Sequence, residues 1–182
     1  MKGKTFFLVV AAVLVATLRV ASAEELPEYQ VKAEFIERFT RFIDWPAPAA
    51  GNRERPRFVI GIYGRSPFRT YLSDMASSHR IKGKPIEIRQ LTSLDSLTGC
   101  DVVFISSSER KTLPKILPVV AERSVLTVGD TPGFAEEGVL INFFTDGDKV
   151  RFEINASAVE KSGLKMTSKL LKLARVVEGS VR

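Results

Sequence analysis

The pattern of apolar and polar residues begins with an amphipathic helix, predicted over 28–43. Its apolar side chains recur at helical spacing, opposite a charged face. The apolar stripe is Val31, Phe35, Phe39 and Phe42 with Ile36 and Ile43 alongside, and the opposing residues are Glu34, Glu37, Arg38 and Arg41. The helix should stop before Pro46, because the residue preceding a proline is pushed out of the helical region. Residues 46–56 are then predicted to be a surface loop.

Four apolar runs predict the strands of a sheet. They are 57–63, 86–91, 102–105 and 125–128. The run at 102–105 is apolar throughout, which suits a central strand covered on both faces. Between the strands, one helix is predicted from Ser66-Pro67 to about Ser77, with the serine as its cap. A second is predicted over 106–120, where two internal prolines should kink or segment it.

The C-terminal third predicts a turn of helix near 132–136, a hairpin and a final helix. The hairpin strands are 139–144 and 150–154, joined through Asp146-Gly147. The second strand alternates apolar with polar residues, as expected when one face is packed. The final helix is predicted to dock by one face and to show a basic stripe on the other. Its apolar side is Met166, Leu170, Leu173, Ala174 and Val177, and its basic side is Lys161, Lys165, Lys169, Lys172 and Arg175.

The order of these elements predicts an α/β fold. It indicates a single three-layer domain, in which a mostly parallel sheet carries an antiparallel C-terminal hairpin and flanking helices. About 160 residues follow the N-terminal segment, enough for one domain of ordinary size that buries its own core.

The first 23 residues have the pattern of a secretory signal. Lys2 and Lys4 precede a long apolar run, and Ala21-Ser22-Ala23 supplies the small residues that a signal peptidase reads. The alternative is a retained membrane anchor, but the uncharged run is shorter than the roughly 18–20 residues that a span needs. We therefore predict that 1–23 is a cleaved signal and that 24–182 is the exported domain.

Charge and cysteine content narrow the classes of partner. The formal net charge of +6 falls to +3 without the three basic residues of the signal, which is too small a surplus to predict nucleic-acid binding. Cys100 is the only cysteine, so no disulfide can form within the chain. It is predicted to be a small buried residue at the start of a core strand, with a reactive or intermolecular thiol as the alternative.

Three strand ends carry polar residues that could form a ligand site. In an open α/β sheet, ligands favour the crevice at the carboxyl ends of the strands. The candidate residues there are Arg65, Ser66, Ser106, Ser107 and Asp130. Two of the ends precede predicted helix starts, which attract anions, and Arg65 would add a charged contact. The alternative is that the serines cap helices and Asp130 begins a turn.

Catalysis and metal binding are poorly supported. His79 is the only histidine and falls at a predicted helix end, where an exposed helix cap is favoured over a general base. One cysteine and one histidine cannot form a structural zinc site, and Asp146-Gly147-Asp148 lacks the remaining ligands of a calcium loop. Asn155-Ala156-Ser157 matches a glycosylation sequon, but Asn155 or Ser157 is expected to cap a helix. We therefore predict no catalytic residue, metal or cofactor.

Five segments in register resemble a known family. At the C-terminal end, a strand with Phe152, Ile154 and Asn155 leads into Gly163, Leu164 and Lys165 and then SKLLKLAR at 168–175. The upstream matches are EYQVKAEFIERFTRFIDWP at 28–46, FVIGIYGRSPF at 58–68, GCDVVFIS at 99–106 and VLTVGDTPGFAEEGVLINF at 125–143. Over nearly its whole mature length, the chain resembles the YfiR family of small periplasmic proteins.

The resemblance implies a periplasmic regulator without enzymatic activity. Members bind the extracytoplasmic part of an inner-membrane diguanylate cyclase and hold it inactive, so cyclic di-GMP signalling and biofilm formation would be the readout. The candidate partner-binding residues are Lys165, Lys169 and Lys172, whose cations could attract an acidic surface or anionic lipids. The alternative is that these lysines only solvate a docked helix. Many relatives carry one cysteine where this chain has Gly61 and a second where Cys100 stands.

Two other functions stay open. A periplasmic small-ligand-binding protein would use the strand-end crevice. An enzyme would have to use Asp130 or the serines, although no motif positions a base beside them. A homodimer and contact with a membrane surface also stay open as interactions of the exported domain.

Overall fold

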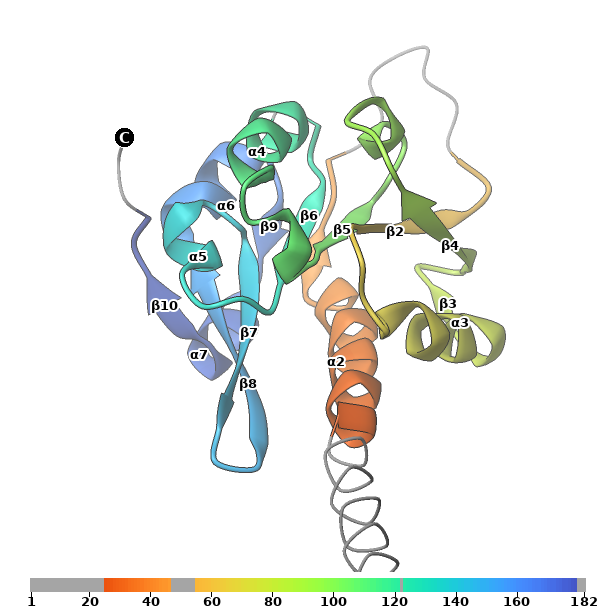
Figure 1. Cartoon of the computed structure of the whole chain (residues 1–182), viewed down its shortest axis with the longest axis horizontal. Coiled ribbons are helices and arrows are strands. Elements are labelled where there is room, and N and C mark those ends of the chain that lie inside the picture. The colour runs from red at the N-terminus through yellow and green to blue at the C-terminus, as the bar shows by residue number, and fades with distance from the viewer. Residues whose placement is uncertain (1–24, 47–54, 122, 180–182) are drawn as a thin grey trace, which may run out of the picture.

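The computed structural model describes residues 25–46, 55–121 and 123–179. The predicted signal segment and most of the predicted loop at 46–56 lie outside these ranges. The described residues form an eight-stranded sheet with helices on both faces, together with a separate two-stranded sheet (Figure 1). The predicted α/β fold class is therefore confirmed.

The large sheet has the strand order β10-β8-β7-β6-β5-β2-β4-β3. Its strands are β2 (Phe58–Tyr63), β3 (Arg80–Ile81), β4 (Lys84–Leu91), β5 (Val102–Ile105), β6 (Leu126–Gly129), β7 (Ile141–Asp146), β8 (Lys149–Asn155) and β10 (Arg175–Val177). Pairing is parallel from β4 through β2, β5 and β6 to β7, and β8 runs antiparallel to β7. The predicted hairpin is present, but β10 pairs outside it and forms the edge.

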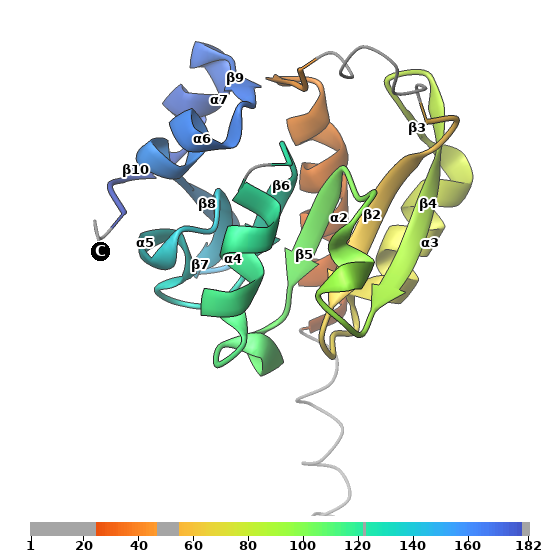
Figure 2. The same ribbon diagram turned by 90° about the horizontal axis from the view of Figure 1, so that it is seen from above.

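Helices cover the sheet on both faces. The helical elements are α2 (Glu25–Thr40), α3 (Phe68–Ser78), α4 (Leu113–Ala121), α5 (Phe134–Glu137), α6 (Ala156–Ser162) and α7 (Ser168–Leu173), with short 3-10 turns η1 (Asp95–Leu97) and η2 (Ser107–Glu109). Figure 2 shows α4 on one face and α2 with α3 on the other. Along β5, Val102 and Phe104 enter the core under α2, whereas Val103 and Ile105 enter the core under α4. This alternation confirms the predicted central strand and the three layers.

Helix α2 is rotated relative to the predicted apolar stripe. Val31 was expected in the core but is 41% exposed, and Glu37 was expected on the charged face but is buried. The reason is that Phe35 and Phe39 pack on Phe152, which turns the buried arc toward β8. The helix ends at Thr40, earlier than predicted, and Ile43–Asp44 then form β1.

The prediction of a single C-terminal helix after the hairpin is wrong. Residues 156–177 form α6, the short strand β9 (Lys165–Met166), α7 and β10. Gly163, at φ +74°, ends α6 in the left-handed conformation that glycine favours. The next backbone groups pair with other strands, because β9 is antiparallel to β1 and β10 is parallel to β8. The apolar stripe breaks as a result: Leu170 is 2% exposed and Leu173 is 72% exposed.

Two local predictions are resolved by the backbone. The segment predicted as a kinked helix over 106–120 is divided into η2 and α4, with Pro118 inside α4. The hairpin turn consists of Gly147 and Asp148, one residue later than expected, because Asp146 still pairs with Lys149. The loop glycine has φ +59°, as tight hairpin turns require.

Cys100 is buried at the start of β5, as predicted, and burial raises the pKa of its thiol. A Cβ atom added to Gly61 would lie 3.0 Å from Cys100 Sγ and 2.5 Å from Cδ1 of Leu91. The first distance lies between the S–S bond length and the Cβ–Cβ separation of a disulfide, about 2.0 and 3.8 Å. The two positions at which relatives carry cysteines are therefore neighbours in this fold.

The contrast between Leu170 and Leu173 predicts opposite outcomes for the same substitution. Leu170→Ala should lower the free energy of unfolding by about 2–5 kcal/mol, because it leaves a cavity beneath α7. Leu173→Ala should change it by no more than about 0.5 kcal/mol, since the side chain faces solvent. Urea denaturation of both variants measures the difference, and equal destabilisation would contradict the observed break in the stripe.

Gly61→Cys should form a disulfide with Cys100 under oxidising conditions. Closing this loop of the chain should raise the free energy of unfolding by up to about 4 kcal/mol, less the cost of moving the Leu91 side chain. A non-reducing gel detects the disulfide, and urea denaturation with and without reductant measures the change in the free energy of unfolding. Gly61→Ser is the matched control, because it adds a similar side chain that cannot bond. Two titratable thiols in the oxidised folded variant would refute the prediction.

Candidate functional site

The three polar strand ends predicted as a ligand site lie at one edge of the sheet. Strand pairing aligns Tyr63 with Ile105 and Ile105 with Gly129, so the residues that follow each strand emerge side by side. The predicted juxtaposition of these strand ends is therefore present. What the side chains do there differs from one residue to the next.

The serines at this edge hold the loops together. The Ser106 hydroxyl is buried, donates to the Arg65 carbonyl and accepts a hydrogen bond from the Ser108 amide. In return, the Arg65 amide donates to Ser108 Oγ at 3.1 Å. Ser66 Oγ accepts from the amide of Phe68, the first residue of α3, at 3.2 Å, but Pro67 occupies the cap position, so the helix begins one residue later than predicted.

Asp130 is bound by two side chains of α2, Tyr29 and Lys32, that were not among the candidate residues predicted from the sequence. Lys32 Nζ lies 2.9 Å from Asp130 Oδ2 and 2.5 Å from Glu28 Oε1, and the lysine side chain is only 4% exposed. The Tyr29 hydroxyl donates to the same Asp130 oxygen at 3.1 Å. Burial, followed by the neighbouring Asp130 carboxylate, raises the pKa of Tyr29 well above its usual value. The signal in the sequence was Lys32 itself, a cation four residues before the buried Ile36 of the same helix.

Helix α2 therefore occupies part of the strand-end crevice. Asp130, Ser66 and Ser106 are engaged in internal hydrogen bonds. Arg65 and Ser107 are exposed, and within the described ranges their side chains have no hydrogen-bonding partner. A ligand at this edge would meet these two side chains first.

A row of polar side chains crosses the C-terminal half of the sheet. Asn142 Nδ2 donates to Glu153 Oε1 at 3.1 Å, and Arg175 Nε donates to Glu153 Oε2 at 3.1 Å. The Arg175 guanidinium also lies 4.2 Å from the centre of the Phe144 ring. Glu153 is 2% exposed, so this pairing fixes β10 to β8. Arg175 was predicted on the basic face of a helix but instead belongs to this network.

The three lysines predicted to bind a partner are exposed, but they do not share one helix. Lys165 lies on β9, whereas Lys169 and Lys172 lie on α7. The Thr167 amide donates to the Phe42 carbonyl at 2.9 Å, which fixes the start of α7 beside the end of α2. Lys169 and Lys172 thus belong to a helix that starts beside the end of α2.

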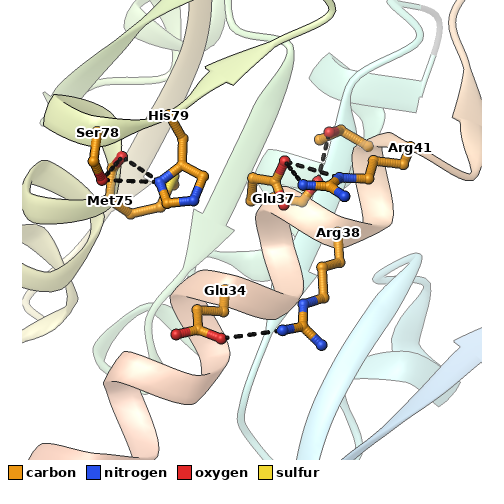
Figure 3. Close-up of polar contacts among 8 residues, drawn as sticks. Glu34, Glu37, Arg38, Arg41, Met75, Ser78 and His79 are labelled. Carbon is orange, nitrogen blue, oxygen red and sulfur yellow. Dashed lines mark hydrogen bonds and ion pairs between the residues drawn. The ribbon is translucent and has the colours of Figure 1, made fainter.

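A hollow of about 580 Å³ crosses that outer face; we call it the α2 hollow. It is lined by Glu34, Phe35, Glu37, Arg38, Phe39, Arg41 and Phe42 of α2, Met75 and His79 at the end of α3, Phe152 of β8, and Leu170 and Leu173 of α7. Figure 3 shows the α2 ion pairs beside the end of α3. There, Ser78 Oγ and the Met75 carbonyl lie 2.9 and 3.2 Å from His79 Nδ1. His79 is thus an exposed helix end, as predicted.

Two further features of the described ranges bear on chemistry. These ranges contain no group of three or more His, Cys, Asp and Glu side chains placed to hold a metal ion. None of the helices within them combines the length and the apolar character needed to cross a membrane. Asn155 is the cap of α6, as expected from its sequence position, and its Oδ1 accepts from the Ala158 amide at 2.8 Å.

Several solved structures share the fold. A Streptococcus pneumonia ABC domain in complex with L-Trp matches with a TM-score of 0.55 and 13% identity, over 82% of this chain and 60% of that one. A conserved domain protein from Vibrio cholerae matches with a TM-score of 0.56 and 11% identity, over 81% of this chain and 59% of that one. A substrate binding protein with adhesive properties from Clostridium difficile, in its ligand-free, open structure, matches with a TM-score of 0.52 and 14% identity. This match covers 68% of this chain and 55% of that one. The chain thus spans less than two thirds of each, and at these identities the likeness concerns the fold alone.

The family comparison is more specific. No curated protein matches the chain significantly. The family described as YfiR/HmsC-like, however, matches residues 29–175, from the second turn of α2 to the first residue of β10. At the level of the family, this supports a periplasmic regulator in cyclic di-GMP signalling. Because the match covers most of the chain and includes seven of the eight strands of the large sheet in full, the chain belongs to the YfiR/HmsC-like family.

Proposed function

We propose that this protein binds the periplasmic region of an inner-membrane diguanylate cyclase and represses it without catalysing a reaction. The family match over 29–175 carries the proposal. Repression of a cyclase would lower cellular cyclic di-GMP and reduce surface attachment. In this proposal, 1–23 is a secretory signal, and 24–182 is the mature domain that acts in the periplasm.

The geometry supports contact with a partner through the surface. Lys165, Lys169 and Lys172 are exposed, so their charges can meet an acidic surface without rearrangement of the fold. His79 is held at a helix end by Ser78 and Met75, away from the strand-end serines, which favours a regulator over a hydrolase. Exposed charges act mainly on the rate and specificity of association.

A second candidate function is capture of a small anionic ligand at the strand ends. Arg65 and Ser107 favour it, because their side chains are exposed where parallel strands end. The engaged Asp130 weighs against it, since a ligand would have to displace a buried lysine. Repression therefore has the stronger support.

Reversing the three lysines to Glu tests the proposed repression. We expect the Lys165→Glu/Lys169→Glu/Lys172→Glu variant to bind the cyclase's periplasmic region more weakly and to raise cellular cyclic di-GMP, as deletion of the gene should. Its melting temperature should change little, because surface substitutions stay within about 0.5 kcal/mol each. Lys111→Glu/Lys115→Glu/Lys149→Glu is the matched control, with the same net charge at other exposed positions. Unchanged cyclic di-GMP and attachment in the deletion strain under several envelope stresses would contradict the function.

Substitution of Asp130 separates a structural role from a ligand role. Asp130→Ala should cost about 3 kcal/mol of unfolding free energy, because it removes one partner of the buried Lys32 ammonium while Glu28 remains. Lys32→Met/Asp130→Leu should recover most of the loss, since apolar residues of similar volume can replace a buried ion pair. Thermal denaturation of both variants measures this. If Asp130→Ala is as stable as the wild type, the carboxylate is not a structural partner and the ligand role gains support.

A further inference from the structure

The side of the α2 hollow that faces α7 has an apolar floor and an exposed lip. Phe39 lies 4.7 Å from Phe152, centre to centre, and both are buried together with Leu170. Phe35 and Phe42 are half-buried above them. Leu173 forms the lip and, at 72%, is the most exposed large apolar side chain in the described ranges. The floor is part of the core, because Phe39 also stacks on Phe143 of the sheet at 5.7 Å.

Cations outnumber free carboxylates around this apolar side. Arg38 is 64% exposed and lies 3.4 Å from Glu34, an ion pair that exposure makes weak. Lys169 and Lys172 flank Leu170 and Leu173 on α7 and are exposed. On the side of the hollow that faces α3, Oε1 of Glu37 accepts from both Nε and Nη2 of Arg41, at 3.0 and 2.9 Å, so this acidic side chain is paired. The occupant of the apolar side should therefore carry negative charge.

We propose that the α2 hollow is the docking site for an acidic amphipathic segment of a partner protein. The segment would insert apolar side chains between α2 and α7 and place Asp or Glu beside Lys169 and Lys172. A concave surface favours a protein over a membrane, since an amphipathic segment can lay its apolar face into a groove, whereas a planar bilayer meets projecting residues. The inference rests on the proposed function only in requiring a protein partner.

Photo-crosslinking in the host cell tests the site in the full-length protein. Benzoylphenylalanine replaces Leu173 in one strain and Val176 in the control; Val176 is 51% exposed, and it does not line the hollow. We expect a protein adduct from position 173 and none from 176. Lys169→Glu/Lys172→Glu should reduce the yield of the adduct, and mass spectrometry should place the crosslink in a segment with apolar residues flanked by Asp or Glu.

The outcomes separate this inference from the proposed function. An adduct of the expected chemistry with a protein other than a diguanylate cyclase would support the docking site and overturn the function. No protein adduct from position 173, equal adducts from both positions, or a basic crosslinked segment would overturn the docking site, while the deletion strain's cyclic di-GMP would still decide the function. A phospholipid adduct from position 173 would also overturn the docking site and would assign this face to contact with the membrane.

Affinity measurements give the size of the effect. Leu173→Glu should weaken binding to the purified periplasmic region of the cyclase by about 10-fold or more, because it replaces the apolar lip of the contact with a charge of the same sign as the bound segment. Val176→Glu makes the same change outside the hollow and should alter the affinity by no more than about 2-fold. Calorimetric titration compares the two, with melting temperatures as a check on folding. Equal affinities would overturn the assignment of this face.

Discussion

The contact between α2 and the C-terminal hairpin determines where this protein can meet other molecules. Phe39 packs edge-on against Phe152 at 4.7 Å and stacks on Phe143 at 5.7 Å, while Phe35 contacts the same two rings. Aromatic pairs of this kind bury large areas and accept few relative orientations. The helix is therefore held at a fixed rotation, with Glu34 and Arg38 outward and Glu37 turned inward.

One consequence appears at the amino-terminal half of α2. With the helix fixed by its phenylalanines, Lys32 faces the sheet and needs a counter-charge, which Asp130 supplies from the end of β6. Ligands of open α/β sheets usually bind at such strand ends. In this chain an intramolecular cation takes that place at Asp130, so Arg65 and Ser107, and not Asp130, are the accessible candidates at the strand ends. A fold shared with a substrate binding protein thus need not carry its binding site.

The local sequence was sufficient for elements whose partners are close along the chain. The alternation within 102–105, the segmentation of 106–120 and the Asn155 cap follow from neighbouring residues, and the structure has them. The C-terminal segment failed for the opposite reason: β9 and β10 form because distant strands β1 and β8 have free edges. The pairing of Lys32 with Asp130 spans 98 positions, so residue spacing could not reveal it. Glu153 had the alternation of a solvent-facing residue, but Arg175 and Asn142 cover it.

The same non-local pairing explains why Leu173 is exposed. Arg175 is bound to the buried Glu153 carboxylate, and Thr167 is bound to the Phe42 carbonyl, so α7 is held at both ends. Seven residues, 168–174, lie between these attachments, and the six-residue helix buries Leu170 while it leaves Leu173 exposed. Individual surface lysines contribute little energy to binding, so Lys169 and Lys172 would mainly speed association. The exposed Leu173 and the half-buried Phe35 and Phe42 would supply most of the affinity and the specificity.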